Sequence, residues 1–206
     1  MIINRLKKFI DNQYKSPKGL IGLYIGEKMV RQHQPETLWT INLLGNLHDE
    51  NILELGCGAG YAMKLILEQS KARQVVGLDV SPTVVRSAAI RNSKAINNGR
   101  ASLVQENVNK LPFQDEEFNK VYSIHSIYFW DNLPQAISEI YRVLKHNGKL
   151  IITLCDGKDG ETWSDIKNMV EQKLLPILEK NGFINVETLT GPSSRQFHTT
   201  AVIAYK

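Results

Sequence analysis

Residues 51–61 read NILELGCGAGY, and this stretch decides the fold of the chain. The run at 52–55 predicts a short buried strand, and residues 62–68 have the character of a helix. Three glycines therefore lie on a strand-to-helix turn. Glycine accepts positive φ and has no Cβ, so the turn can be tight and a ligand can approach its backbone. The free N–H groups of the next helix point into the same space. We therefore expect a nucleotide-like ligand at the carboxyl end of a parallel sheet.

Strand and helix patterns alternate from this turn onward. The expected strands cover 74–80, 101–106, 118–124 and 149–154, and the expected helices cover 82–97, 133–144 and 162–181, the last kinked at Pro176. Residues 145–148 predict a turn. Two further strands, 183–190 and 197–205, have no helix between them, so they can be antiparallel. The alternation predicts a doubly wound α/β fold, with a mostly parallel sheet between two helical layers.

Composition restricts the class of protein. The chain has 206 residues, 42% hydrophobic and 22% charged, which is typical of a globular protein of about one domain. No apolar run reaches the roughly 18–20 residues of a membrane span, and no signal peptide is evident. Cys57 and Cys155 have neither metal-site nor disulfide spacing, so we expect no metal and a cytoplasmic location. The net charge is +4, and the basic residues are scattered and interleaved with acidic ones, so nucleic acid is not the favoured partner. A monomer or homodimer is expected.

The first part of the chain predicts a helical cover. Residues 1–14 can form an amphipathic helix, residues 19–29 are rich in glycine, and residues 35–47 predict a helix with proline in its first turn. We therefore divide the chain into a cover region, 1–48, and a ligand-binding domain, 49–206.

Two acidic residues distinguish between possible ligands. Glu54 stands two residues before the first glycine, where it would repel a pyrophosphate and attract an ammonium group. Tyr61 occupies the place of the third glycine in a dinucleotide fingerprint, so an NAD-dependent oxidoreductase is disfavoured. Asp79 ends the second strand, where a carboxylate can accept hydrogen bonds from both ribose hydroxyls. The alternatives are that Glu54 is only solvated and that Asp79 only caps the next helix.

Four ordered segments carry a family resemblance: LELGCGAG, GLDVS, QENVNKLPFQDEEFNKVYS and EIYRVLKHNGKLIIT. Together they resemble the class I S-adenosylmethionine-dependent methyltransferases, nearest to the type 11 methyltransferase domain, over about residues 50–155. The resemblance implies a Rossmann-like three-layer sandwich whose seven-stranded sheet ends in an antiparallel hairpin. It also implies S-adenosylmethionine as methyl donor and S-adenosylhomocysteine as product.

The resemblance also implies roles for single residues. Glu54 would lie near the methionine amino group, Asp79 would bind the ribose and Val80 would line the adenine. Asn107 stands where the family usually has aspartate; its amide oxygen could still accept from adenine N6, and the Val108 N–H would face the ring. The full expected cofactor-binding set is Glu54, Gly56, Cys57, Gly58, Gly60, Asp79, Val80, Asn107, Val108 and His125.

Residues 123–131, SIHSIYFWD, supply the candidate catalytic groups. His125 follows the strand at the centre of the expected sheet, which makes it a candidate base or orienting group; the alternative is a structural histidine beside the cofactor. Tyr128 is the second candidate, because one ring of this aromatic run could face the sulfonium or the acceptor.

Nothing in the sequence names the acceptor. An Asn-Pro-Pro-Tyr-type motif, a Pro-Cys pair and a long lid after the fifth strand are all absent, so we expect a small-molecule acceptor. Its selectivity would come from residues 19–29, 125–130 and 156–163. Two alternatives stay open: a nucleic-acid or protein methyltransferase, and a catalytically silent S-adenosylmethionine-binding module.

Overall fold

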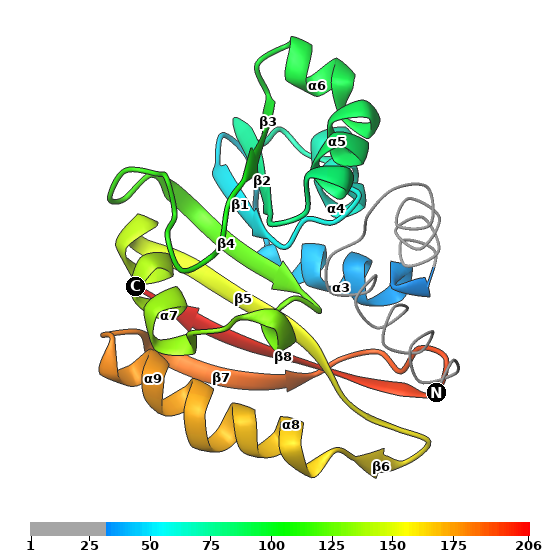
Figure 1. Ribbon diagram of the computed structural model, residues 1–206, viewed down its shortest axis with the longest axis vertical. Helices are drawn as coiled ribbons and strands as arrows, with labels where there is room; N and C mark the ends of the chain where they lie inside the picture. The colour runs from blue at the N-terminus through cyan, green and yellow to red at the C-terminus, as the bar shows by residue number, and fades with distance from the viewer. Residues whose placement is uncertain (1–31) are drawn as a thin grey trace, which may run out of the picture.

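A computed structural model describes residues 32–206 (Figure 1). The expected helix at 1–14 and the glycine-rich stretch at 19–29 lie outside the described residues. The helices are α3 (Gln34–Leu44), α4 (Tyr61–Gln69), α5 (Pro82–Arg91), α6 (Ser93–Asn97), η1 (Ile127–Phe129), α7 (Leu133–Val143), α8 (Ser164–Met169), η2 (Val170–Leu174) and α9 (Leu175–Lys180). The strands are β1 (Asn51–Leu55), β2 (Gln74–Asp79), β3 (Ala101–Gln105), β4 (Phe118–Ile124), β5 (Leu144–Lys158), β6 (Glu161–Thr162), β7 (Ile184–Thr190) and β8 (Phe197–Tyr205).

The strands form one mixed sheet in the order β3-β2-β1-β4-β5-β8-β7, with β6 paired to β5 off this path. Strands β1 to β5 run parallel to one another, whereas β8 runs antiparallel to both β5 and β7. Because β1 and β4 are adjacent and the chain winds outward from them in both directions, ligands are expected where their carboxyl ends meet. The expected doubly wound sheet with a closing antiparallel pair is confirmed; β6 adds a short eighth strand.

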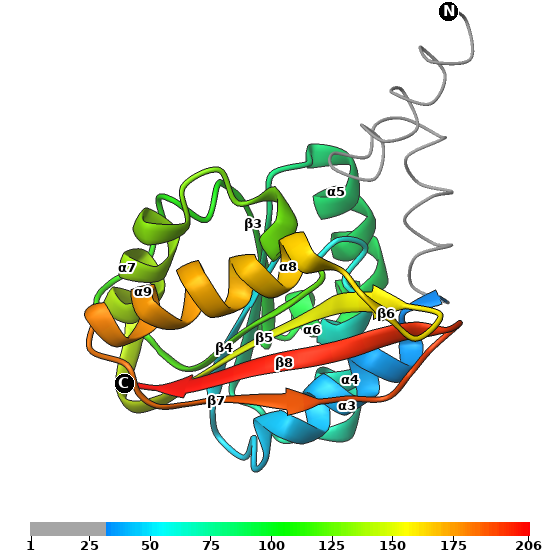
Figure 2. The same cartoon turned by 90° about the horizontal axis from the view of Figure 1, so that it is seen from below.

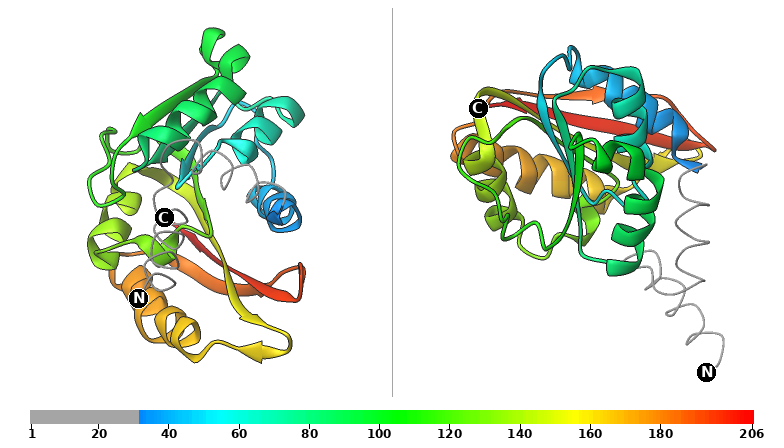
Figure 3. Two further views of the ribbon diagram at one scale, coloured as in Figure 1. Left: turned by 45° about the vertical axis from the view of Figure 1, so that its right-hand side comes forward. Right: turned by 90° about the horizontal axis from the view of Figure 1, so that it is seen from above.

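Helices cover both faces of the sheet and make two apolar cores (Figures 2 and 3). On one face, Leu53 and Leu55 of β1 pack with α7 and the helical run α8–α9. On the other face, Ile52 packs with α3, α4 and Ala88 of α5. Leu53 and Leu55 lie on the face opposite Ile52 because successive side chains of a strand point to opposite faces. Residues 52–55 of β1 are all buried between the two cores.

Helix α3 is part of the second core. Ile41 and Leu44 are buried there, and the Thr40 hydroxyl lies 2.7 Å from that of Thr153 on β5. Lys149 also donates to the Leu43 carbonyl oxygen at 2.6 Å. The helix begins one residue before Pro35 and ends at Leu44, earlier than the expected 35–47, because Gly45 follows it with a φ of 74°. The boundary between a cover region and a domain at residue 48 stays a prediction.

Two expected segments differ from the structure. The predicted turn at 145–148 is instead part of β5, which pairs with β4 through a register shift between Phe118 and Lys120 and so accommodates this polar stretch. The predicted helix 82–97 is broken at Asn92 into α5 and α6. The Asn92 side chain explains the break, since it donates both to the Ala88 carbonyl and to that of Gly60 in the glycine turn.

The expected helix at 162–181 begins at Ser164 and ends at Lys180, and its middle turn, η2, is a π-helix. Pro176 lies at the start of α9, so it has no N–H to donate to residue 172 in an α-helical ladder. A wider turn just before the proline removes that requirement. It also keeps Val170, Leu174 and Leu178, which are spaced by four residues, on the buried face.

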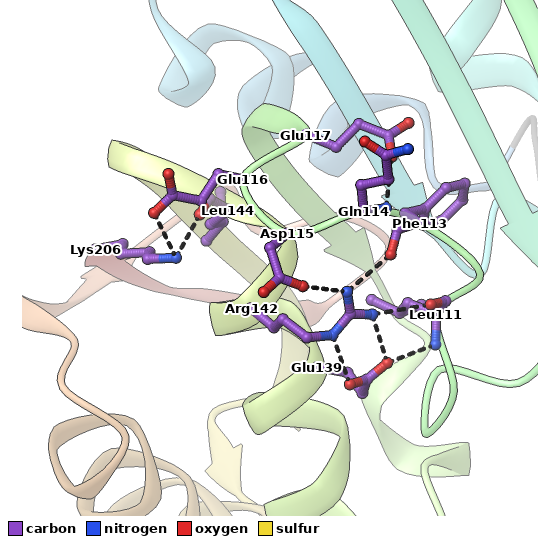
Figure 4. Close-up of polar contacts among 10 residues, drawn as sticks. All are labelled: Leu111, Phe113, Gln114, Asp115, Glu116, Glu117, Glu139, Arg142, Leu144 and Lys206. Atoms are coloured by element: carbon purple, nitrogen blue, oxygen red, sulfur yellow. Dashed lines mark hydrogen bonds and ion pairs between the residues drawn. The ribbon is translucent and has the colours of Figure 1, made fainter.

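Arg142 on α7 fixes the long connection between β3 and β4 (Figure 4). Its guanidinium donates to both carboxylate oxygens of Glu139, at 2.9 and 2.8 Å, and to Asp115 at 2.9 Å. It also donates to the carbonyl oxygens of Phe113 and Leu111, at 2.7 and 2.9 Å. The two carboxylates raise the pKa of Arg142. The connection is therefore held by a network in which the guanidinium uses both of its terminal nitrogens and Nε.

Candidate functional site

The three glycines of the turn between β1 and α4 have different tasks. All three have positive φ, at 75°, 50° and 73° for Gly56, Gly58 and Gly60. A Cβ on Gly56 would lie 2.4 Å from that of Ser126, and one on Gly60 would lie 2.8 Å from that of Ala88. A Cβ on Gly58 would meet no atom within 4 Å. Gly56 and Gly60 therefore allow close packing of neighbouring elements, and Gly58 is the position that leaves open space for a ligand.

Glu54 lies beneath this turn on the α4 side of β1. Its carboxylate is buried and accepts a hydrogen bond from the Tyr122 hydroxyl at 2.9 Å, with a second bond from the Met63 N–H in the first turn of α4. Burial raises the pKa of Glu54 to about 8, against the effect of these two hydrogen bonds. A buried acid at a helix N-terminus is well placed to ionise when a cationic ligand group approaches.

Asp79 joins the glycine turn to the start of α5. One carboxylate oxygen accepts from the Gly58 N–H at 3.0 Å and the other accepts from the Ser81 N–H at 2.9 Å. Burial raises the pKa of Asp79, and these N–H donors oppose the rise. The next residue, Val80, is 47% exposed, which is unusual for a valine at the end of a buried strand. Together they place a carboxylate and an apolar surface beside the open position at Gly58.

Cys57 and the loop after β3 contribute mainly through the backbone. The Cys57 side chain is buried against Gly77, and burial raises its pKa well above the usual thiol range. The Asn107 side-chain oxygen accepts from the Asn109 N–H at 2.9 Å, so it stabilises its own loop. The Val108 side chain is buried in the core with α7.

His125 ends β4 in a left-handed conformation, with a φ of 55°. Such backbone is uncommon for a residue other than glycine and is often found at functional sites. Its N–H donates to the Thr153 carbonyl at 2.9 Å, whereas its Nε2 is buried and has no hydrogen-bond partner. Burial lowers the pKa of His125 to about 3, so the imidazole is neutral near pH 7. A neutral ring with an unpaired nitrogen can act as base, hydrogen-bond donor or metal ligand.

Residues from two distant segments surround His125. The ring of His33, just before α3, lies 4.4 Å from the His125 ring between centroids. Glu36 in the first turn of α3 is 0% exposed, and neither carboxylate oxygen has a hydrogen-bond partner. Arg195, from the connection between β7 and β8, places Nη2 3.9 Å from Glu36 Oε1 and 3.3 Å from His33 Nδ1. Burial acts to raise the pKa of Glu36, but the nearby His33 ring and the backbone N–H of Glu36 itself, with a smaller electrostatic effect of His125, outweigh burial and the pKa is lowered.

The Tyr128 hydroxyl is engaged with the backbone of β5. It donates to the Cys155 carbonyl oxygen at 3.0 Å and also accepts from the Cys155 N–H. Burial raises the pKa of Tyr128. This hydroxyl therefore attaches η1 to β5, and the residue as a whole is 37% exposed.

Several residues of the site were not predicted from the sequence. Arg91 donates to the Ala59 carbonyl and Asn92 to that of Gly60, so the end of α5 holds the glycine turn in place. The Ser126 hydroxyl donates to the Leu55 carbonyl at 2.9 Å and fixes the start of the loop after β4. His33, Glu36 and Arg195 were missed as well, because the sequence gives no spacing signal for side chains that far apart. The one available signal was the pairing of His33 and Glu36 three residues apart at a helix start.

Comparison with known proteins identifies the fold and the family. A family described as "Methyltransferase domain" matches residues 53–152. An uncharacterized methyltransferase from Bacillus subtilis, YdaC, is 33% identical over 129 residues, which cover 63% of this chain and 69% of that protein. Among solved structures, a SAM-dependent methyltransferase from Aquifex aeolicus superposes with a TM-score of 0.72 at 17% identity, covering 88% of this chain and 97% of the other.

A second structural relative is phosphoethanolamine N-methyltransferase 2 from Haemonchus contortus, solved with phosphomonomethylethanolamine and S-adenosylhomocysteine. Its TM-score is 0.68 at 18% identity, and the match covers 83% of this chain but only 52% of that enzyme. This chain therefore spans about half the length of that relative, and the likeness concerns the fold alone. Among the described residues, no helix is long and apolar enough to cross a membrane.

Proposed function

The chain belongs to the S-adenosylmethionine-dependent methyltransferase family, and from this we propose that it methylates a small-molecule acceptor held over the carboxyl ends of β1 and β4. The observation that carries this proposal is the open position at Gly58, bordered by the Asp79 carboxylate and the exposed Val80 side chain. When bound, S-adenosylmethionine supplies a methyl group on a sulfonium that already has a good leaving group.

The chain's own residues fit such a cofactor. Asp79 can exchange its bond to the Gly58 N–H for the hydroxyls of a ribose, and Val80 offers an apolar surface to a purine. Glu54 is already hydrogen-bonded by Tyr122, and its ionised form would balance an amino group above the turn. Asn107 would have to release the Asn109 N–H before its oxygen could accept from adenine. The same side chains are less suited to a pyrophosphate, because two carboxylates border the turn.

Methyl transfer needs alignment more than acid–base chemistry. Holding the nucleophile in line with the methyl group and excluding water can supply about 7–11 kcal/mol. His125, neutral and buried beside the turn, would orient the acceptor, because an imidazole with a pKa of about 3 is too weak a base to take the acceptor's proton. Gly56 packs directly on Ser126, so the chain segment that carries His125 is fixed relative to the glycine turn. The proposal therefore gives His125 a role at the acceptor and gives the Tyr128 hydroxyl a positioning role.

Calorimetry with S-adenosylhomocysteine tests the cofactor part of this proposal. We expect saturable binding, no binding of NADH, and at least tenfold weaker binding by Asp79→Ala. The matched control is Asp165→Ala, which removes an exposed carboxylate from the first turn of α8 and should leave affinity unchanged. Unchanged affinity in Asp79→Ala would refute the ribose assignment.

The nature of the acceptor needs a separate test. Turnover with a panel of small phenols, thiols and amines would support the proposal. Tight RNA binding that weakens steeply with salt, together with RNA methylation, would favour the nucleic-acid alternative. Cofactor binding without turnover on small molecules, RNA or protein would favour the silent binding module.

A further inference from the structure

The cluster of His33, Glu36 and His125 has the composition of a metal site. One ligand atom from each residue lies within 4.8 Å of the other two. Two imidazole nitrogens and one carboxylate oxygen are a common ligand set for Zn²⁺ and other divalent transition metals. Expected metal–ligand distances of about 2.0–2.2 Å place neighbouring ligand atoms roughly 3.4 Å apart in a tetrahedron.

Unpaired polar atoms point to a missing ligand at this cluster. Buried carboxylates and imidazoles in proteins are almost always hydrogen-bonded, because an unpaired buried polar group is costly. Here both oxygens of Glu36 and Nε2 of His125 are buried with no partner. Within residues 32–206, His33 Nδ1 and Arg195 Nη2 each lie 3.9 Å from Glu36 Oε1, which is beyond hydrogen-bond distance. A divalent cation at the centre would satisfy all three atoms at once.

The backbone already presents these side chains to one another. His33 immediately precedes α3 and Glu36 lies three residues later, so the two side chains share one side of the helix start. Helix α3 is anchored to β5 through Thr40 and Thr153, and Thr153 also accepts the His125 N–H through its carbonyl. Thr153 therefore fixes the distance between the α3 side of the cluster and His125.

We propose that His33, Glu36 and His125 bind one divalent transition-metal ion, with Zn²⁺ as the reference metal, and leave at least one coordination position open. Arg195 lies at the rim of the site, with Nη2 3.9 Å from Glu36 Oε1. Its side chain is 36% exposed, so it can move to solvent when a metal binds. Arg195 and the metal therefore compete for Glu36. In the methyl transfer proposed above, and resting on it, the open position would hold an anionic oxygen or sulfur of the acceptor near the glycine turn.

The experiment measures metal binding rather than turnover, so its failure is independent of the methyltransferase assignment. The full-length protein is dialysed against a chelator under reducing conditions and titrated with Zn²⁺ by calorimetry and with Co²⁺ by visible absorption. We expect one equivalent of metal to bind with micromolar or tighter affinity. The visible absorption bands of bound Co²⁺ should be those of a four- or five-coordinate site. Glu36→Gln and His125→Asn should each weaken binding at least tenfold; asparagine is chosen because it tolerates positive φ.

Two further variants separate this site from adventitious binding. Arg195→Ala should bind Zn²⁺ more tightly than the wild type, because the competing guanidinium is gone. The control His146→Gln removes an exposed histidine that lies 3.6 Å from the Glu116 carboxylate, and it should bind as the wild type does. Circular dichroism and urea denaturation would verify that each variant is folded. Wild-type affinity in Glu36→Gln and His125→Asn, or no stoichiometric binding by the wild type, would overturn the proposal.

Discussion

Arg142 and Arg195 both approach carboxylates, but their surroundings differ. Arg142 makes direct hydrogen bonds to Glu139, Asp115 and two carbonyl oxygens. Arg195 comes no closer than 3.9 Å to Glu36, whose two oxygens stay unpaired although they are buried. A fully paired network adds stability and fixes one conformation, whereas an unpaired buried charge costs free energy. The cluster around Arg142 therefore maintains the fold, whereas the cluster around Glu36 keeps buried polar atoms available to a ligand.

The largest expected effect is on the paired cluster. Arg142→Ala should lower the free energy of unfolding by about 2–3 kcal/mol, because it leaves the Glu139 carboxylate without its main partner. Urea denaturation measures this loss. The control is Arg73→Ala, which removes an exposed ion pair to Asp49 and should cost less than about 1 kcal/mol. Equal losses of stability in Arg142→Ala and Arg73→Ala would show that the Arg142 network stabilises the fold no more than an exposed ion pair does.

Glu54 extends the comparison to a third buried carboxylate, one that is paired but neutral near pH 7. Its pKa is raised to about 8 in the folded protein from 4.5 in the unfolded chain, so the folded state holds the extra proton between these values. Its contribution to stability is therefore lost as pH rises through this window. The wild type should lose about 2 kcal/mol more than Glu54→Gln between pH 6 and 8, as measured by urea denaturation. Parallel pH profiles for the two proteins would contradict the burial argument.

Matched glutamine substitutions compare the two clusters directly. Glu139→Gln should cost about 1–2 kcal/mol, because it replaces an acceptor for Arg142 and for the Leu111 N–H with a group that accepts less. Glu36→Gln should stay within about 1 kcal/mol of the wild type when measured with a chelator, since no hydrogen bond is broken. A larger loss in Glu36→Gln would show that its charge already has an effective partner.

The smallest expected effect concerns Tyr128. Tyr128→Phe should lower the free energy of unfolding by about 1 kcal/mol through loss of its bonds to the Cys155 backbone. S-adenosylhomocysteine affinity, measured by calorimetry, should not change. An unchanged free energy of unfolding would mean that the hydroxyl does not hold η1 on β5.

The sequence was sufficient for the fold because its signals are local. The strand-to-helix turn at Gly56–Gly60, the proline at the start of α5 and the missing helix before β8 each act within a few residues. The break at Asn92 and the extended β5 depend on partners in distant segments, namely Gly60 and the shifted register of β4. The residues proposed to bind the cofactor have local signals, because most of them lie at the carboxyl ends of β1 and β2 or follow these strands within a few residues. The cluster around His125 has no such local signal, because α3, β4 and the connection before β8 meet only after folding.

The place of β8 between β5 and β7 affects how β7 folds during synthesis. Strand β7 pairs only with β8 in the described sheet, and β8 follows it in the chain. As the chain emerges from the ribosome, β7 must wait with both of its edges unpaired until β8 has been made and has docked on β5. Exposed edges of that kind are liable to aggregate when they are apolar. The residues of β7 are mostly exposed and include Asn185, Glu187 and Thr188. The polar side chains make the unpaired strand less liable to aggregate before β8 docks.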